Sequence, residues 1–256
     1  MMLVASLALG RRALRNVLRR PQFFAPLVIF PTVFLAVNVG GLSRTTDLPG
    51  FPRVNGFLDF QLSAGITQSL LLGGVSAGIA VALEIEMGFF DRLAAAPIPR
   101  ASMIMGRIGA ASVIAIIQAL YFLVLGLIFG ASIEGGLVGF LMVLVIASIA
   151  GTGFAAMGVM LALLAKNAST VQGIFPLVFV ILFVSSAFFP RALLEEPARS
   201  IARFNPLSYI SDGMRDPIIS TISWGPVLEG VAAALGLVLV FGGLCVVALR
   251  GRLRDA

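Results

Sequence analysis

Long uninterrupted apolar runs constrain the fold of this chain more than any other feature of its sequence. Hydrophobic residues make up 59% of the 256 positions and charged residues only 12%, and the apolar runs do not alternate with polar positions. A helix needs about 20 apolar residues to cross a hydrocarbon core about 30 Å thick. Continuous runs favour helices over a membrane barrel, whose strands alternate. The sequence therefore predicts an all-α, multi-pass membrane protein.

Six runs are long enough to cross a membrane as helices, and polar or Gly- and Pro-containing segments separate them. The second run contains Gly74-Val-Ser-Ala-Gly78, a small-xxx-small pattern that permits close contact between helices. We therefore expect a single transmembrane domain over residues 1–256 with six transmembrane helices. The predicted spans are residues 23–42, 62–83, 104–129, 137–164, 171–189 and 227–249.

Residues 1–20 predict an amphipathic helix ahead of the first span. Its arginines lie on an arc beside a stripe of leucines, which is typical of a helix that lies in the membrane interface. The charges follow the first apolar residues instead of preceding them, so the pattern is not that of a signal peptide. The leucines are Leu3, Leu7, Leu14 and Leu18, and the arginines are Arg11, Arg12, Arg15, Arg19 and Arg20.

The densest polar island inside the apolar sequence covers residues 84–100. Met87, Phe90 and Ala94 recur at helical spacing and give the segment one apolar face. Pro97 ends the helix, because proline cannot donate to the helical ladder. The pattern predicts a short amphipathic helix between the second and third spans. It indicates either a docking element for a partner outside the bilayer or an ordinary loop helix on the lipid headgroups.

The basic residues predict the orientation of the chain. Placing the N-terminus inside puts twelve of the 18 basic residues on the cytoplasmic side and six outside. The excess favours a cytoplasmic position for both termini and for residues 84–100. Arginines that cluster beside apolar runs are explained by this orientation and by anionic membrane lipids, so no nucleic-acid partner is expected.

Several kinds of chemistry are excluded by residues that the sequence lacks. The single lysine, Lys166, stands between Ala165 and Asn167, so there is no Gly-Lys-Ser/Thr phosphate loop and no ATP site of the Walker type. Without histidine, neither an HExxH zinc site nor a Ser–His or Cys–His pair can form. No charged residue falls at the middle of a predicted span, where an ion-coupled transporter usually carries one. We therefore expect no catalytic residues, metal site or bound cofactor, and a conduit that draws its energy from another protein.

Two stretches resemble motifs of the type 2 ABC transporter permeases. The first is Glu84-Ile-Glu86-Met-Gly88-Phe-Phe-Asp91-Arg-Leu93-Ala-Ala-Ala-Pro97-Ile-Pro-Arg100, which is similar to the cytoplasmic coupling motif of that family: a glutamate, a glycine soon after, a leucine, then proline and a basic residue. The second is Asn205-Pro206-Leu207-Ser208-Tyr209, followed by Asp212 and Arg215, which is similar to the signature before the last span. The likeness covers nearly the whole chain and is closest to the drug-resistance, daunorubicin-exporter-like branch.

The resemblance implies a permease in the cytoplasmic (inner or plasma) membrane that binds two copies of a separate ABC ATPase. A second permease, either an identical copy or a similar paralogue, would complete the transporter. ATP and magnesium would be bound by the ATPase and not by this chain. Residues 84–100 would form a cytoplasmic coupling helix after span two, and residues 190–223 a re-entrant amphipathic segment before span six that acts as an extracellular lid. The substrate path would lie between the two permeases, lined mainly by spans one, two and five.

The resemblance also assigns candidate residues to ATPase coupling. Phe89, Phe90 and Leu93 are expected to seat the coupling helix in a groove of the ATPase, while charged residues fix its register. Gly88 would permit close backbone approach. The coupling candidates are Glu84, Glu86, Gly88, Phe89, Phe90, Asp91, Arg92, Leu93, Pro97 and Arg100.

The second candidate site is the extracellular lid. Its residues would gate the exit of substrate, and the alternative is that Asn205-Pro206 starts a turn and caps the helix that follows. The lid candidates are Asn205, Pro206, Tyr209, Asp212 and Arg215.

Export of an amphipathic drug-like or lipid-like substrate is the leading functional expectation. Sugar rings usually stack on aromatic side chains, and this chain has one Trp and two Tyr against 20 Phe. Export of a polysaccharide or lipid-linked glycan stays an alternative. From other classes we consider a secondary transporter, an intramembrane enzyme and a non-transporting scaffold. A secondary transporter predicts an intramembrane carboxylate or an inverted repeat, and the sequence shows neither convincingly.

Overall fold

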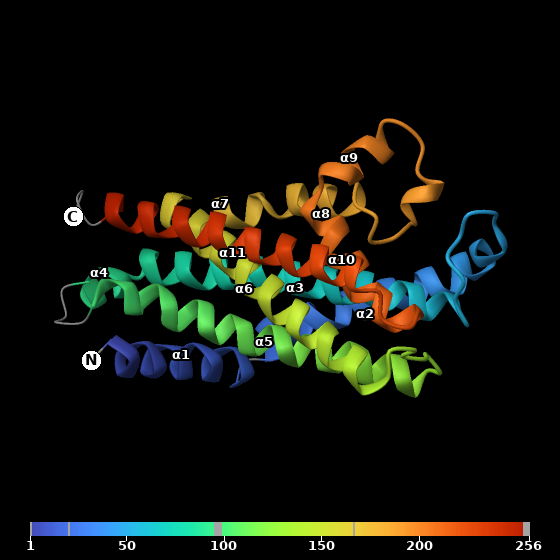
Figure 1. Ribbon diagram of the computed structural model, residues 1–256. Helices are drawn as coiled ribbons and strands as arrows, with labels where there is room; N and C mark the ends of the chain where they lie inside the picture. The colour runs from blue at the N-terminus through green and yellow to red at the C-terminus, as the bar shows by residue number, and fades with distance from the viewer. Residues whose placement is uncertain (1, 20, 95–98, 166, 253–256) are drawn as a thin grey trace.

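The computed structural model of the protein describes residues 2–19, 21–94, 99–165 and 167–252, and within these ranges every regular element is helical. Long helices run side by side along one axis (Figure 1). The longer helices are α1 (Met2–Arg19), α2 (Pro21–Leu42), α3 (Phe57–Glu86), α5 (Arg100–Ile128), α6 (Gly136–Ala165), α10 (Pro206–Ile219) and α11 (Trp224–Arg252). The shorter ones are η1 (Ser43–Asp47), α4 (Phe89–Ala94), α7 (Ala168–Gly173), α8 (Phe175–Phe183), η2 (Arg191–Leu193) and α9 (Ala198–Phe204).

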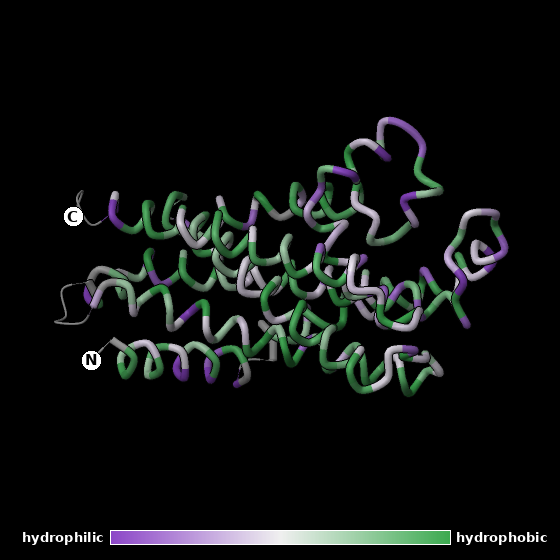
Figure 2. The backbone as a smooth tube through the Cα atoms, in the orientation of Figure 1, coloured by the Kyte–Doolittle hydropathy of each residue, from purple (hydrophilic) through white to green (hydrophobic). Residues whose placement is uncertain are grey.

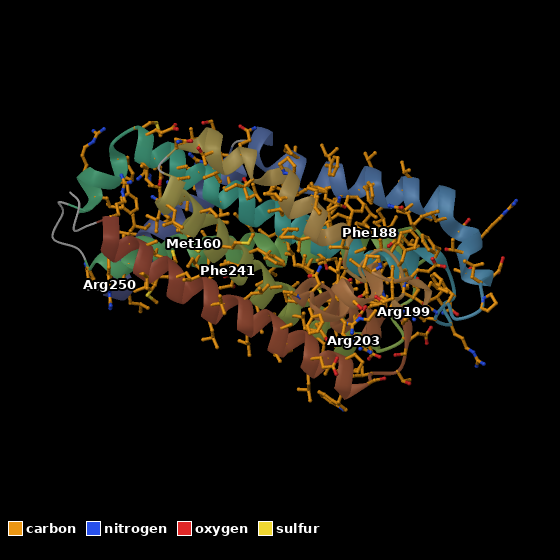
Figure 3. All side chains as sticks on the ribbon, turned by 90° about the horizontal axis from the view of Figure 1, so that it is seen from above. Met160, Phe188, Arg199, Arg203, Phe241 and Arg250 are labelled. Atoms are coloured by element: carbon orange, nitrogen blue, oxygen red, sulfur yellow. The ribbon has the colours of Figure 1, made fainter. Side chains whose placement is uncertain are left out.

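The bundle has two distinct ends. Both chain termini, α4 and α7 lie at one of them, which we call the terminal end, while η1, the α5–α6 turn, α9 and α10 lie towards the other, the distal end (Figure 1). Apolar residues dominate the middle of the long helices, and polar residues concentrate in the distal loops and on α1 (Figure 2). Arg250 marks the terminal end and Arg199 and Arg203 the distal one (Figure 3). This division of polarity is what a membrane-spanning bundle requires.

Five described helices are long and apolar enough to cross a membrane: Phe24–Asp47, Phe57–Glu86, Ala101–Ile128, Gly136–Ala165 and Trp224–Arg252. Each overlaps one of the predicted spans, so the all-helical prediction is confirmed at these five places. Helix α3 is the core of the bundle, with 67% of its most apolar window buried, against 11% for α11. The sides of α11 are therefore left open to lipid or to another chain.

The fifth predicted span, residues 171–189, differs from the expectation of one continuous helix. It consists of α7 and α8, which are separated at Ile174. Pro176 stands in the first turn of α8, and a proline there removes the hydrogen bond that would continue α7. Together the two helices cover Ala168–Phe183, about 24 Å of rise at 1.5 Å per residue. A sixth span therefore stays a prediction.

Glycine permits the closest helix crossing in the core. A Cβ added to Gly74 would lie 2.5 Å from the carbonyl oxygen of Phe154, and one added to Gly78 would lie 2.5 Å from that of Gly158. Because no real Cβ approaches a backbone oxygen so closely, only glycine lets α3 and α6 pack at this distance. The small-xxx-small prediction for Gly74 and Gly78 is confirmed.

Helix α1 packs against the first half of α5 through a second close approach. A Cβ on Gly106 would lie 2.6 Å from the carbonyl oxygen of Ser6. The predicted amphipathic helix therefore exists, and Leu3, Val4 and Leu7 remain 73%, 71% and 65% exposed on it. Its place in a membrane interface stays a prediction.

Candidate functional site

The polar island forms a sharp turn followed by one short helix at the terminal end. Gly88 has a φ of +65°, in the left-handed region that glycine adopts without strain, and it redirects the chain from α3 into α4. Arg92 closes this turn, because its Nε donates to the carbonyl oxygen of Gly88 at 3.3 Å and its Nη2 to that of Met87 at 3.2 Å. The segment is therefore held in a defined direction by its own side chains.

The two adjacent phenylalanines of α4 have different surroundings. Phe90 is 1% exposed and belongs to a cluster with Ile85, Met103 and Leu163. Its ring therefore anchors α4 to this chain and is not available to enter a groove of a partner, which corrects the docking role predicted for it. Phe89 is half-buried, with the guanidinium carbon of Arg12 3.9 Å from its ring centroid.

The two glutamates of the island contact this chain as well. Glu84 forms an ion pair with Arg107, which ties α3 to α5. Glu86 accepts a hydrogen bond from the backbone nitrogen of Ala168 at 2.8 Å and so ties the end of α3 to the start of α7. Their charges are used inside the chain, where the sequence predicted contacts to a partner.

Of the remaining coupling candidates, Arg92 and Leu93 lie close to the exposed Met87, which the sequence did not name as a coupling residue. Met87 is 62% exposed, Arg92 is exposed, and Leu93 is half-buried against the cluster around Phe90. Pro97 and the side chains of Asp91 and Arg100 lie outside the part of the chain that the structure describes. Met87, Arg92 and Leu93 are thus the described island side chains best placed to meet a partner.

At the distal end, Asn205 and Pro206 begin α10. The Asn205 side chain accepts a hydrogen bond from the backbone nitrogen of Leu207 at 3.0 Å, and Pro206 is at the start of the helix, where its missing N–H costs nothing. The Nδ2 of Asn205 also donates to the carbonyl oxygen of Ile181 at 2.7 Å, which fixes α10 to α8. The capping interpretation of this pair is confirmed.

Arg215 is the most connected side chain at the distal end. It is 5% exposed and donates to three backbone carbonyl oxygens: Phe60 at 3.2 Å, Ser186 at 3.0 Å and Ala187 at 2.5 Å. Its Nη1 lies 2.5 Å from Asp212. One guanidinium therefore joins α3, the segment after α8, and α10.

Asp212 and Tyr209 extend this cluster. Asp212 accepts from Ser186 Oγ at 2.9 Å and pairs with Arg191 at 3.0 Å, and the Arg191 guanidinium lies 4.3 Å from the Tyr209 ring centroid. Burial lowers the pKa of Arg215, and the Asp212 carboxylate opposes that shift. Because an arginine pKa starts far above neutrality, the guanidinium stays charged.

Sequence reasoning missed several residues that hold the distal end together. Asp59, placed in a loop by the sequence, lies in the first turn of α3 and is 2% exposed. Its carboxylate accepts from the backbone nitrogen of Ser132 at 3.1 Å and from Ser132 Oγ at 3.2 Å. An acidic residue close before an apolar run is the only local signal for such a helix start. Ser186 and Arg191 carry no local signal.

No group of three or more His, Cys, Asp or Glu that could hold a metal ion occurs among the described residues. The two clusters therefore consist of ion pairs and hydrogen bonds that position helices.

Comparison with known proteins decides the family. The family model of the ABC-2 type transporters matches residues 5–219 of this chain. The chain belongs to this family. It is 28% identical over 96% of its length to a putative transport permease, ycf38, of Porphyra purpurea, of which 89% is covered. It is also 27% identical, over 73% of its length and 63% of the relative, to the probable doxorubicin resistance ABC transporter permease protein DrrC of Mycobacterium tuberculosis.

Family membership indicates the role of the chain. An ABC-2 permease is the membrane subunit of an ABC transporter, so this chain is a multi-pass membrane protein with a transport permease role. Membership implies an ABC ATPase as a partner. The likeness to DrrC supports the drug-resistance branch that the motifs indicated.

Proposed function

We propose that this chain is the permease of an ATP-driven exporter and that α4 transmits the movement of its ATPase. The observation that carries the proposal is the construction of the Gly88 turn and α4. Phe90 anchors the short helix in the core of the chain, while Met87 in the turn before it and Arg92 on it are left exposed. A segment that is rigidly anchored and has an exposed edge can pass a push from a partner into α3 and α5.

The assembly and orientation follow from the same proposal. Both termini and residues 84–100 face the cytoplasm, where two copies of the ATPase bind ATP and magnesium. The chain pairs with a second permease in the cytoplasmic membrane, and α7 and α8 together complete a sixth crossing. Residues 190–223 lie on the external side as a lid that Arg215 and Asp212 hold closed.

The substrate is an amphipathic drug-like or lipid-like molecule that leaves the cytoplasmic side. Support comes from a cluster of phenylalanines that are contributed by α2, by α8 and by the segment that follows α8. The rings of Phe34 and Phe188 are 5.2 Å apart, those of Phe30 and Phe179 5.7 Å, and Phe30 is 49% exposed. Phenylalanine rings offer apolar stacking and no hydrogen bond, which suits an apolar substrate better than a sugar. The printed name of DrrC points in the same direction.

The coupling role is tested by Met87→Asp in vesicles that contain the chain and its partner ABC ATPase. We expect the permease-dependent stimulation of ATP hydrolysis and the ATP-driven transport of doxorubicin to fall at least about tenfold, because a charge replaces an apolar contact at a protein interface. The unfolding midpoint should hardly change, since Met87 is 62% exposed. Leu93→Asp should abolish coupling too, with some loss of stability because Leu93 packs on the core.

The matched control is Val4→Asp on α1, which changes another strongly exposed apolar residue at the same end of the bundle (71% exposed, against 62% for Met87). It should leave the stimulation of the ATPase close to that of the unmodified chain. Normal transport and normal stimulation in Met87→Asp would refute a coupling role for this edge. Transport by the purified chain without any ATPase would refute the energy source.

A further inference from the structure

A cavity of about 360 Å³ lies at the terminal end between α1, α3 and α4. This is within the range of small-molecule sites. Its walls combine two arginines with apolar and small side chains. The lining residues are Arg12, Asn16, Val17, Ser76, Ala80, Leu83, Glu84, Met87, Phe89 and Arg92.

A second cavity of about 90 Å³ continues from the first towards the middle of the bundle, between α1, α3 and α5. The two are contiguous, because they share the lining residues Asn16, Val17, Ser76, Ala80 and Glu84. Beyond these the second cavity is mainly apolar, with Ala77, Ala110 and Ile114 along it. We call the first cavity, which is polar, the mouth, and the second, which is mainly apolar, the throat.

The charges at the mouth do not balance. Glu84 is ion-paired with Arg107, so its carboxylate is already neutralised. No carboxylate among the described side chains lies within ion-pairing distance of Arg12 or Arg92. Arg12 stacks on Phe89, and Arg92 uses only Nε and Nη2 in the turn. Because a guanidinium has five N–H donors, both arginines keep donors for a ligand.

We propose that this cavity binds the phosphate headgroup of an anionic phospholipid. Arg12 on α1 and Arg92 on α4 would donate to the phosphate oxygens, since the planar guanidinium fork matches phosphate geometry. The first methylenes of an acyl chain would lie along Ala77, Ala80 and Ile114. The apolar throat is the reason to choose a lipid over a free anion, which would gain nothing from it.

The bound lipid would connect α1 to α4, because the two arginines come from these two helices. It would hold the short helix against α1 without the partner being present. The proposal therefore does not depend on the proposed exporter function, and the purified chain alone is sufficient to test it.

The test is a titration of the purified full chain in a zwitterionic detergent with dioctanoyl phosphatidylglycerol and with dioctanoyl phosphatidylcholine. Both lipids carry the phosphate, but phosphatidylcholine adds a choline cation that the two guanidinium groups repel. We therefore expect the anionic lipid to bind at least about tenfold more tightly. Arg12→Gln combined with Arg92→Gln should remove this preference. Arg12→Gln alone should weaken it severalfold and leaves the turn at Gly88 intact, and Arg12→Lys should restore part of it.

The matched control is Arg15→Gln combined with Arg19→Gln, which removes the same charge from exposed arginines of α1 that do not line the cavity. It should keep the preference. An equal loss in this control would show diffuse attraction to a basic helix and overturn the proposal.

Two further outcomes separate the alternatives. Displacement of the lipid by inorganic phosphate at a similar concentration would show a free-phosphate site and overturn the choice of a lipid. A double variant that keeps the preference for the anionic lipid, but fails to stimulate the partner ATPase, would show that the arginines contact protein instead. Ala77→Leu, at a position that lines only the throat, should weaken binding of the lipid and leave phosphate binding unchanged.

Discussion

Arg215 at the distal end is 5% exposed and donates to three backbone carbonyl oxygens, whereas Arg12 and Arg92 at the terminal end are exposed and pair with no described carboxylate. The distal arginine joins three segments of the same chain into one closed cluster. The terminal arginines border a cavity and an exposed edge. The difference indicates that the distal end is completed by the chain itself and that the terminal end is built to be completed by something else.

Arg215→Met should produce the largest effect and tests the closed distal cluster. The change removes one hydrogen-bond donor from each of three carbonyl oxygens and leaves Asp212 without its partner in α10. Breaking one side of a buried ion pair costs about 3–5 kcal/mol, so we expect the free energy of unfolding in mixed micelles to fall by about that amount. Arg203→Met, at an exposed position in α9, is the matched control and should change it by less than about 0.5 kcal/mol.

If Arg12→Met lowered the free energy of unfolding as much as Arg215→Met does, the proposed difference between the two ends would be wrong. A terminal arginine would then be part of the folded core of the chain. A small effect of Arg12→Met, beside a large effect of Arg215→Met, would sharpen the contrast.

Phe90→Ala should have the second largest effect and tests how the terminal end is anchored. Removing a fully buried phenylalanine ring costs about 3 kcal/mol or more, because a cavity remains among Ile85, Met103 and Leu163. Phe89→Ala, the neighbouring half-buried ring, should cost about 1 kcal/mol. Both are measured as unfolding free energies, and equal costs would contradict the inward orientation of Phe90.

Gly88→Ala should have the smallest effect on stability, about 1 kcal/mol, because alanine is strained at a φ of +65°. Nothing lies within 4 Å of the added Cβ, so the cost is one of backbone conformation and not of a clash. Gly88→Asn should cost less, since asparagine tolerates this conformation better. If alanine were as harmless as asparagine, the turn would not constrain the direction of α4. Stimulation of the partner ATPase, measured in the same preparations, should fall with alanine and recover with asparagine.

Patterns within single segments of the sequence predicted most of the helices and one of the helix contacts. The apolar runs placed five helices, and the pair Gly74 and Gly78 predicted a close helix crossing that the structure confirms. Asn205 followed by Pro206 predicted a helix start that also exists. The predicted span at residues 171–189 is two helices, because hydropathy alone does not register the break that Pro176 makes.

The candidate sites were predicted by their position in the chain and less well by the direction of their side chains. Glu84 and Glu86 contact α5 and α7, and Phe90 enters the core, where contacts to a partner were expected. Asp59 and Ser186 were missed, because each bonds to a residue 26 or more positions away. The pattern of residues within one segment cannot predict a hydrogen bond to a residue so distant in the sequence.

The sequence by itself determined that this chain is a helical membrane protein and that it contains no Gly-Lys-Ser/Thr motif, because run length and local motifs are properties of single segments. Only the tertiary structure decided which of the adjacent rings Phe89 and Phe90 turns inward, and that Arg215 closes one end while Arg12 and Arg92 leave the other open. The physical reason is that burial and charge pairing depend on helices that are distant in the chain and adjacent in the bundle.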